Sequence, residues 1–147
     1  NFAFRPDGTL VVYDFGCVKR LEPDSIEACR DVVAAALQPD WAGVDDALHR
    51  LGVRVPGSAP LPEGFYAAWR PILLKPFLSE GPFDFARSTI HKAVMAKSPE
   101  VLKLTDRLQP PVKTAYVDRM TSGHYWTLVH LGARLQLRPE LERYLQA

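Results

Sequence analysis

The sequence has little of what several classes of functional site require. Its two cysteines, Cys17 and Cys29, form neither a C-x-x-C pair nor a disulfide framework, which favours a reducing compartment and argues against a structural zinc site. The four histidines show none of the spacings typical of metal enzymes. No apolar run approaches the roughly 20 residues that span a bilayer. The formal net charge is only +1, so we expect no nucleic-acid partner. We therefore expect a cytoplasmic protein, at most peripheral to a membrane.

The charges that are present are unevenly distributed along the chain. Residues 22–48 are acidic and carry Arg30 as their one basic residue. Residues 87–119 are basic, with Arg and Lys outnumbering Asp and Glu. Solvated helix faces are the favoured interpretation of both runs. A basic face near a membrane is the alternative.

The first 21 residues, NFAFRPDGTLVVYDFGCVKRL, predict a β-hairpin. Two runs rich in aromatic and β-branched residues, 1–4 and 9–15, flank Pro6-Asp7-Gly8, whose Pro and Gly suit a turn. An isolated two-stranded hairpin is marginal in water. This hairpin is therefore expected to pack on helices or to continue a structure that precedes it.

After Leu21 the apolar spacing becomes helical, and residues 22–147 predict roughly six or seven helices. Asp24, with Glu27 three residues later, is interpreted as the capping box of the first helix. Asp40 is expected to cap a second helix that ends at Gly52. The Pro- and Gly-rich residues 52–64 then predict a surface loop.

The second half of the chain is also predicted to be helical. Ser98-Pro99 is interpreted as a helix start, because Ser can cap and Pro suits the first helical position. A long helix is expected from about residue 112 to 131, before Gly132. Residues 138–146 predict a short amphipathic helix.

The hairpin carries residues suited to a metal ion. Asp14-Phe15-Gly16 follows a hydrophobic strand, and Asn1 begins the neighbouring one. In kinase folds an Asp and an Asn at the outer ends of one hairpin come side by side and hold magnesium. Carboxylate and amide oxygens suit this ion, which usually takes phosphate oxygens as well. Asn1 and Asp14 are therefore predicted metal ligands. The alternative is that Asp14 simply caps a turn after the strand.

Residues 1–21 resemble the stretch that follows the catalytic loop in the UbiB/AarF-type family of atypical, protein-kinase-like enzymes, where a D-x-H-x-x-N motif leads into a similar hairpin and DFG. Residues 108–141 resemble the late helix of the same family, which has an Arg, a Gly-aromatic pair and an LGA run. Here these are Arg119, Gly123-His124-Tyr125 and Leu131-Gly132-Ala133. The residues between the two ends are compatible in their helical character and carry no distinctive motif.

This resemblance implies a mainly α chain with one N-terminal β-hairpin, forming the C-terminal half of the helical C-lobe of a protein-kinase-like (α+β) fold. Residues 1–21 would be the metal-binding hairpin and residues 22–147 the helical subdomain. Mg²⁺ would be held by Asn1 and Asp14 in a protein that binds ATP. On the cofactor side, Phe15 would pack below the metal and Gly16 would let the chain turn away.

The family's catalytic Asp and His, and its nucleotide-binding loop, should lie before Asn1. We therefore expect a fragment with no catalytic residue of its own, inactive in isolation. The parent would be an atypical kinase or ATPase of the phosphotransferase class, linked to isoprenoid-quinone (ubiquinone-type) biosynthesis or lipid homeostasis, with a lipid or quinone-pathway partner. One alternative is a catalytically silent helical scaffold that binds a protein or membrane lipid. A small-molecule phosphotransferase is a third.

Other distinctive side chains are interpreted as structural. Arg119 is expected to form a structural ion pair, since a buried Arg is rarely unpaired. Cys17 is expected to be a small buried hydrophobe, with a reactive thiol near the nucleotide as the alternative. Four aromatic residues at helical positions are expected in the core: Trp41, Tyr66, Trp69 and Trp126.

Overall fold

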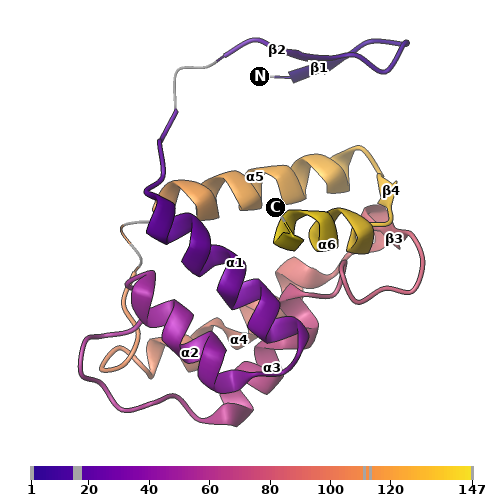
Figure 1. Ribbon diagram of the computed structural model, residues 1–147. Coiled ribbons are helices and arrows are strands. Elements are labelled where there is room, and N and C mark those ends of the chain that lie inside the picture. The colour runs from indigo at the N-terminus through magenta and orange to yellow at the C-terminus, as the bar shows by residue number, and fades with distance from the viewer. Residues whose placement is uncertain (1, 15–17, 111, 113, 147) are drawn as a thin grey trace.

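Helices make up most of the computed structural model (Figure 1), which describes residues 2–14, 18–110, 112 and 114–146. Within these residues the α-helices are α1 (Pro23–Leu37), α2 (Trp41–Arg50), α3 (Glu63–Leu73), α4 (Ile90–Leu102), α5 (Ala115–His130) and α6 (Arg138–Gln146). Strands β1 (Phe2–Phe4) and β2 (Leu10–Val12) pair at the N-terminus, and β3 (Phe83–Asp84) pairs with β4 (Arg134–Leu135). A single 3₁₀ turn, η1 (Phe85–Arg87), follows β3. The prediction of a mainly α chain with an N-terminal hairpin is confirmed.

The hairpin has the predicted turn. β1 and β2 are antiparallel, and the register places Phe2 opposite Val12 and Phe4 opposite Leu10. Gly8 has a φ of 85°, which glycine adopts without a Cβ penalty. The carboxylate of Asp7 accepts a 2.9 Å hydrogen bond from the Thr9 amide and so closes the turn. In Figure 1 the hairpin lies beside α5, away from α2 and α3.

Helices α1 and α2 pack side by side through small residues. Ala28 of α1 and Ala47 of α2 are both fully buried. At the start of α2 the Asp40 carboxylate accepts a 3.0 Å hydrogen bond from the Gly43 amide, which confirms the predicted cap. A Cβ at Gly43 would lie 2.4 Å from Asp40 Oδ2, so any larger residue there would displace the capping carboxylate.

The predicted start of α1 is wrong by two residues. The helix begins at Pro23, and Glu22 rather than Asp24 occupies the capping position, with φ −70° and ψ 144°. Proline suits the first helical position because its φ is fixed near the helical value and its missing N–H is not needed there. Asp24 therefore lies in the first turn, where its negative charge interacts favourably with the positive end of the helix dipole.

Helix α4 corrects another predicted boundary. Ser98 and Pro99 lie inside one continuous helix and do not begin a new one. The Ser98 hydroxyl donates a 2.9 Å hydrogen bond to the Val94 carbonyl, as serine can within a helix. Pro99 leaves the Met95 carbonyl without its helical donor, but Met95 is 72% exposed and water can reach this turn.

The core lies between α2 and α3 and extends under the loop that joins them. Val44, Leu61 and Tyr66 are its buried centre, and Trp41 stacks on Tyr66 with ring centroids 6.3 Å apart. Leu61 belongs to the stretch that the sequence predicts as a surface loop. That prediction is therefore wrong for part of the loop.

Arg54, also in this loop, is only 1% exposed. Its guanidinium donates to Asp45 Oδ1 at 2.7 Å, to the Arg107 carbonyl at 2.6 Å and to the Ala59 carbonyl at 2.5 Å. Tyr66 donates to the same Asp45 oxygen. The buried Arg54 cation thus fixes the loop to α2 and to the segment after α4, and Asp45 links it to Tyr66 of α3.

The C-terminal helices close the other end of the molecule. α5 ends at His130, and Gly132, whose φ is 61°, follows the capping residue Leu131, which confirms the predicted stop. β4 then pairs with β3, an element that the sequence patterns do not predict. α6 confirms the predicted short helix and buries Leu141. The Arg30 guanidinium of α1 lies 5.1 Å from the ring centroid of Tyr144 in α6.

None of the described helices has the length and apolarity needed to cross a bilayer.

Candidate metal-binding groove

Asp14 follows β2 closely, with Tyr13 between it and the end of the strand. Its side chain is exposed. The antiparallel register brings the beginning of β1 to the same end of the hairpin, since Phe2 pairs with Val12. Three of the predicted site residues, Asn1, Phe15 and Gly16, lie outside the described residues, as does Cys17.

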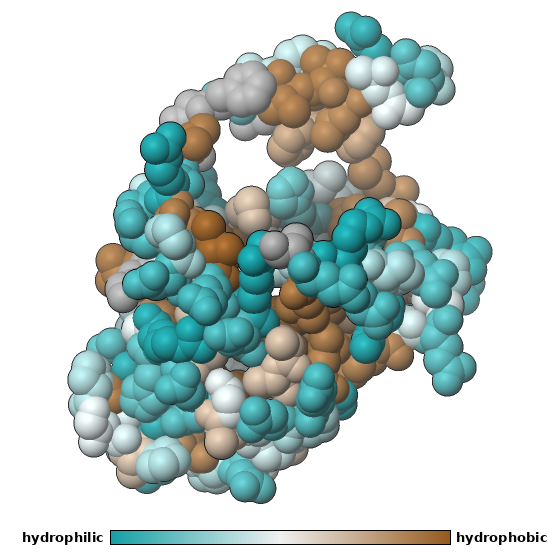
Figure 2. Space-filling model, viewed as in Figure 1, coloured by the Kyte–Doolittle hydropathy of each residue, from teal (hydrophilic) through white to brown (hydrophobic). Residues whose placement is uncertain are grey.

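A groove of about 610 Å³ separates this end of the hairpin from α5. Asp14 and Phe2 line it from the hairpin, and Lys19 lines it from the segment before α1. Arg119 and His124 line it from α5. Figure 2 shows an opening beneath the hairpin, between it and the position of α5 in Figure 1.

The groove combines one carboxylate with two cations. Asp14 supplies a hard oxygen of the kind that magnesium prefers. Lys19 and Arg119 supply the ammonium and guanidinium groups that bind phosphate oxygens. Sequence reasoning named Asp14 but missed this combination, because five positions separate Lys19 from Asp14 and Arg119 lies far along the chain.

Arg119 does not have the buried pairing role expected from the sequence. It lies on the exposed side of α5 and faces the groove. Among the residues that the structure describes, Arg54 is the buried, ion-paired arginine. The apolar spacing of the sequence could not show which of the two arginines is buried, since neither lies in a motif that indicates burial.

The walls of the groove are largely apolar and solvent-accessible. Phe2 is 45% exposed, Val18 80%, and on α5 Tyr116 and Met120 are 52% and 54% exposed. Ligand sites typically combine apolar walls with a few convergent polar groups. The groove therefore has the composition of a site for a molecule with both charged and apolar parts.

The Gly123-His124-Tyr125 group holds α5 between the hairpin and the helical body. The His124 ring lies 5.9 Å from the Phe2 ring, centroid to centroid. On the other side of α5, the Tyr125 hydroxyl lies 3.0 Å from Ser88 Oγ and 3.1 Å from His91 Nδ1. Adjacent residues of one helix thus contact opposite parts of the molecule, which fixes the orientation of the groove wall.

Only some of the four aromatic residues predicted to lie in the core are buried there. Trp41 and Tyr66 belong to the core, and Trp69 is half-buried beside Phe65. Trp126 is 41% exposed, and its ring lies 4.9 Å from that of His91. The prediction is therefore wrong for Trp126, which covers the surface between α4 and α5.

Within the described ranges no group of three or more His, Cys, Asp and Glu residues is placed to hold a metal ion. The predicted ligand pair, Asn1 and Asp14, is not a group of this type, because it has one amide and one carboxylate. Comparisons of the chain with protein-family models, with curated proteins and with solved structures found no match.

Proposed function

We propose that this chain supplies the metal-binding hairpin and helical lobe of a UbiB/AarF-type, kinase-like protein that binds Mg·ATP. The observation that carries the proposal is the groove in which Asp14, at the end of a DFG-type hairpin, faces the same space as Lys19 and Arg119. A carboxylate next to two cations suits a magnesium ion and the phosphates that accompany it. The resemblance of residues 1–21 and 108–141 to that family supports the same function.

The donor set fits the ion that the proposal requires. Asp14 would hold magnesium together with Asn1, and the bound ion would neutralise charge that builds up on the phosphates. Lys19 and Arg119 would bind phosphate oxygens and orient them in the groove. Phe15 and Gly16 would shape the chain around the metal. The apolar walls of the groove would contact the apolar part of the bound molecule.

The proposed reaction class is ATP hydrolysis or phosphoryl transfer in a protein that acts in isoprenoid-quinone biosynthesis or lipid homeostasis. The proposed location is the cytoplasm, with peripheral membrane contact and a lipid or quinone-pathway partner. The family's catalytic Asp and His are no part of residues 1–147. On this proposal the 147-residue chain binds Mg·ATP weakly and does not hydrolyse it unaided.

Paramagnetic broadening of amide resonances tests this proposal, because it detects weak metal sites. Mn²⁺ would be titrated into the ¹⁵N-labelled chain with ATP present. We expect selective broadening at residues 12–14 and at Arg119 and His124 of α5. Asp14→Asn should reduce the broadening about tenfold, because the amide removes the anionic ligand. Asp7→Asn is the matched control, since Asp7 is an exposed carboxylate at the other end of the same hairpin.

Equal broadening in Asp14→Asn and the wild type would contradict the metal assignment. A complementary measurement uses the longest natural form of the protein. Mg·ATP should raise its melting temperature, and Asp14→Asn should abolish the rise. A folded protein whose melting temperature does not respond to Mg·ATP would overturn the nucleotide proposal and favour the helical scaffold.

A further inference from the structure

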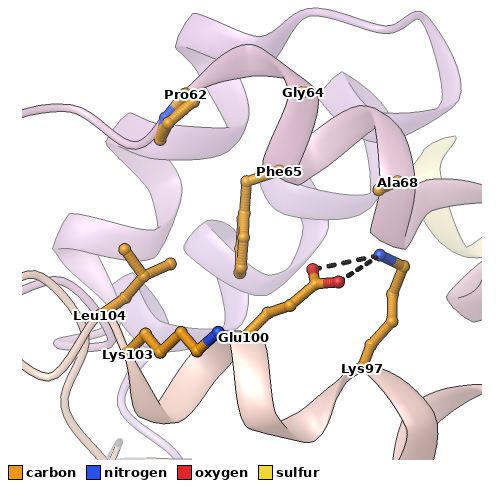
Figure 3. A pocket seen from close by; sticks show the side chains of 8 residues that line it. All are labelled: Pro62, Gly64, Phe65, Ala68, Lys97, Glu100, Lys103 and Leu104. Atoms are coloured by element: carbon orange, nitrogen blue, oxygen red, sulfur yellow. Dashed lines mark hydrogen bonds and ion pairs between the residues drawn. The ribbon is translucent and has the colours of Figure 1, made fainter.

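A second cavity, of about 460 Å³, lies between the first turns of α3 and the last turn of α4. Figure 3 shows it from close by. It shares no lining residue with the groove at Asp14. Its volume lies within the range of small-molecule sites, roughly 300 to 1,000 Å³.

The floor of this cavity is apolar and rigidly supported. The Phe65 side chain projects from α3 towards α4, and Leu104 lies beside it on the α4 side (Figure 3). Both residues pack against the buried core around Val44 and Tyr66. A ligand on this floor would therefore rest on side chains that the core already holds in place.

The α3 wall is open because its residues are small. Gly64 and Ala68 line the cavity one helical turn apart. A Cβ built at Gly64 would meet no atom within 4 Å. This wall leaves room for an apolar chain to lie along α3 above Phe65.

The α4 rim is positively charged. Lys97 Nζ contacts both carboxylate oxygens of Glu100 at 3.1 Å, so these two charges compensate each other. Among the described residues Lys103 has no carboxylate within ion-pair distance. One positive charge, that of Lys103, thus stands uncompensated at the edge of an apolar floor.

We propose that this cavity binds an amphipathic monocarboxylate, with an acyl or aryl chain on Phe65 and Leu104 and the carboxylate paired with Lys103. The charge match favours a single negative charge, since Lys103 is the one uncompensated charge among the described lining residues. Most of the binding energy comes from the apolar chain, because an exposed lysine contributes little to an ion pair. The site does not depend on the proposed function at Asp14.

The affinity should therefore follow chain length as well as charge. Two additional methylenes, about half buried in an open cavity, are expected to tighten binding about fourfold. Octanoate should bind about four times more tightly than hexanoate. Octanol and octylammonium, which share the chain but lack the negative charge, should bind more weakly than octanoate.

Amide chemical shifts of the ¹⁵N-labelled chain, titrated with each of these compounds below its micelle concentration, give the test. Octanoate should shift the amides of Gly64, Ala68 and Leu104, and saturation should follow one binding curve. Lys103→Gln should weaken octanoate binding about threefold, as expected for an exposed ion pair. Lys92→Gln, an exposed lysine of α4 that does not line the cavity, should leave the affinity unchanged.

A steric variant separates this site from nonspecific adsorption. Gly64→Leu should obstruct the α3 wall and strongly reduce the octanoate shifts, whereas Gly64→Ala should preserve them and keep the helix intact. Retained binding in Gly64→Leu would overturn the proposal, as would equal affinities for octanoate and octylammonium. The spectrum without ligand shows whether each variant is folded. Asp14→Asn should bind octanoate like the wild type, so this result is independent of the metal groove.

Discussion

Removal of the buried guanidinium of Arg54 tests the main structural conclusion about the loop between α2 and α3. Arg54→Met keeps most of the side-chain volume and removes the charge. The guanidinium has no exposed surface, and it donates hydrogen bonds to Asp45, Ala59 and the Arg107 carbonyl. In the variant the Asp45 carboxylate, 18% exposed, loses its cation and two carbonyls lose their donors.

Loss of one partner from a buried ion pair typically costs about 3 to 5 kcal/mol. Asp45 keeps the Tyr66 hydroxyl as a donor, which places the expected loss near the lower end of this range. Domains of this size have a total stability of about 5 to 15 kcal/mol, so the variant should remain folded but weakened. With a urea m value of about 2 kcal/mol/M, the unfolding midpoint should fall by about 1.5 M.

Urea unfolding followed by circular dichroism at the helical band measures this change. Arg50→Met is the matched control, because Arg50 also contacts two carboxylates, those of Asp31 and Asp46, but its side chain is 41% exposed. Exposed pairs contribute little, so the control midpoint should hardly move. The reasoning is refuted if the two variants lose similar stability, or if Arg54→Met loses less than about 1 kcal/mol.

Two titrating groups give further predictions. Burial, together with the hydrogen bond to Asp45, raises the pKa of Tyr66 well above its ordinary value. The unfolded chain then ionises this tyrosine first, so stability should fall as the pH rises above about 10, and Tyr66→Phe should show a smaller fall in alkaline urea titrations. Burial and the nearby Asp118 raise the pKa of the Cys29 thiol. A disulfide reagent at pH 8 should therefore modify Cys29 several times more slowly in the folded than in the urea-unfolded protein, and equal rates would contradict its burial.

The sequence predicted those elements whose local chemistry and tertiary packing agree. Gly8 and Gly132 were expected at turns, and both have positive φ. Asp40 was expected to cap α2, and its carboxylate bonds the Gly43 amide. In each case the residue suits the local backbone geometry, so the pattern could be interpreted without knowing its tertiary contacts.

The errors arise where a distant contact decides the outcome. Ser98-Pro99 has the composition of a helix start, yet α4 continues through it. The strand pair β3–β4 joins residues about fifty positions apart, and neither two-residue strand is long enough to show an alternating pattern. The same limit applies to the groove, where Asp14 and Arg119 line one space because the hairpin lies against α5.

The loop anchored by Arg54 also affects how the chain could be divided. The Val55 amide donates to the Arg107 carbonyl and the Gln109 amide donates to the Val53 carbonyl, each at 2.9 Å, which links this loop to a segment more than fifty positions away. A protease cut near Gly57 would leave two pieces that are still held together by these bonds and by the core. The loop between α2 and α3 is accordingly the place to split this protein into complementing halves, although its composition resembles that of a flexible linker.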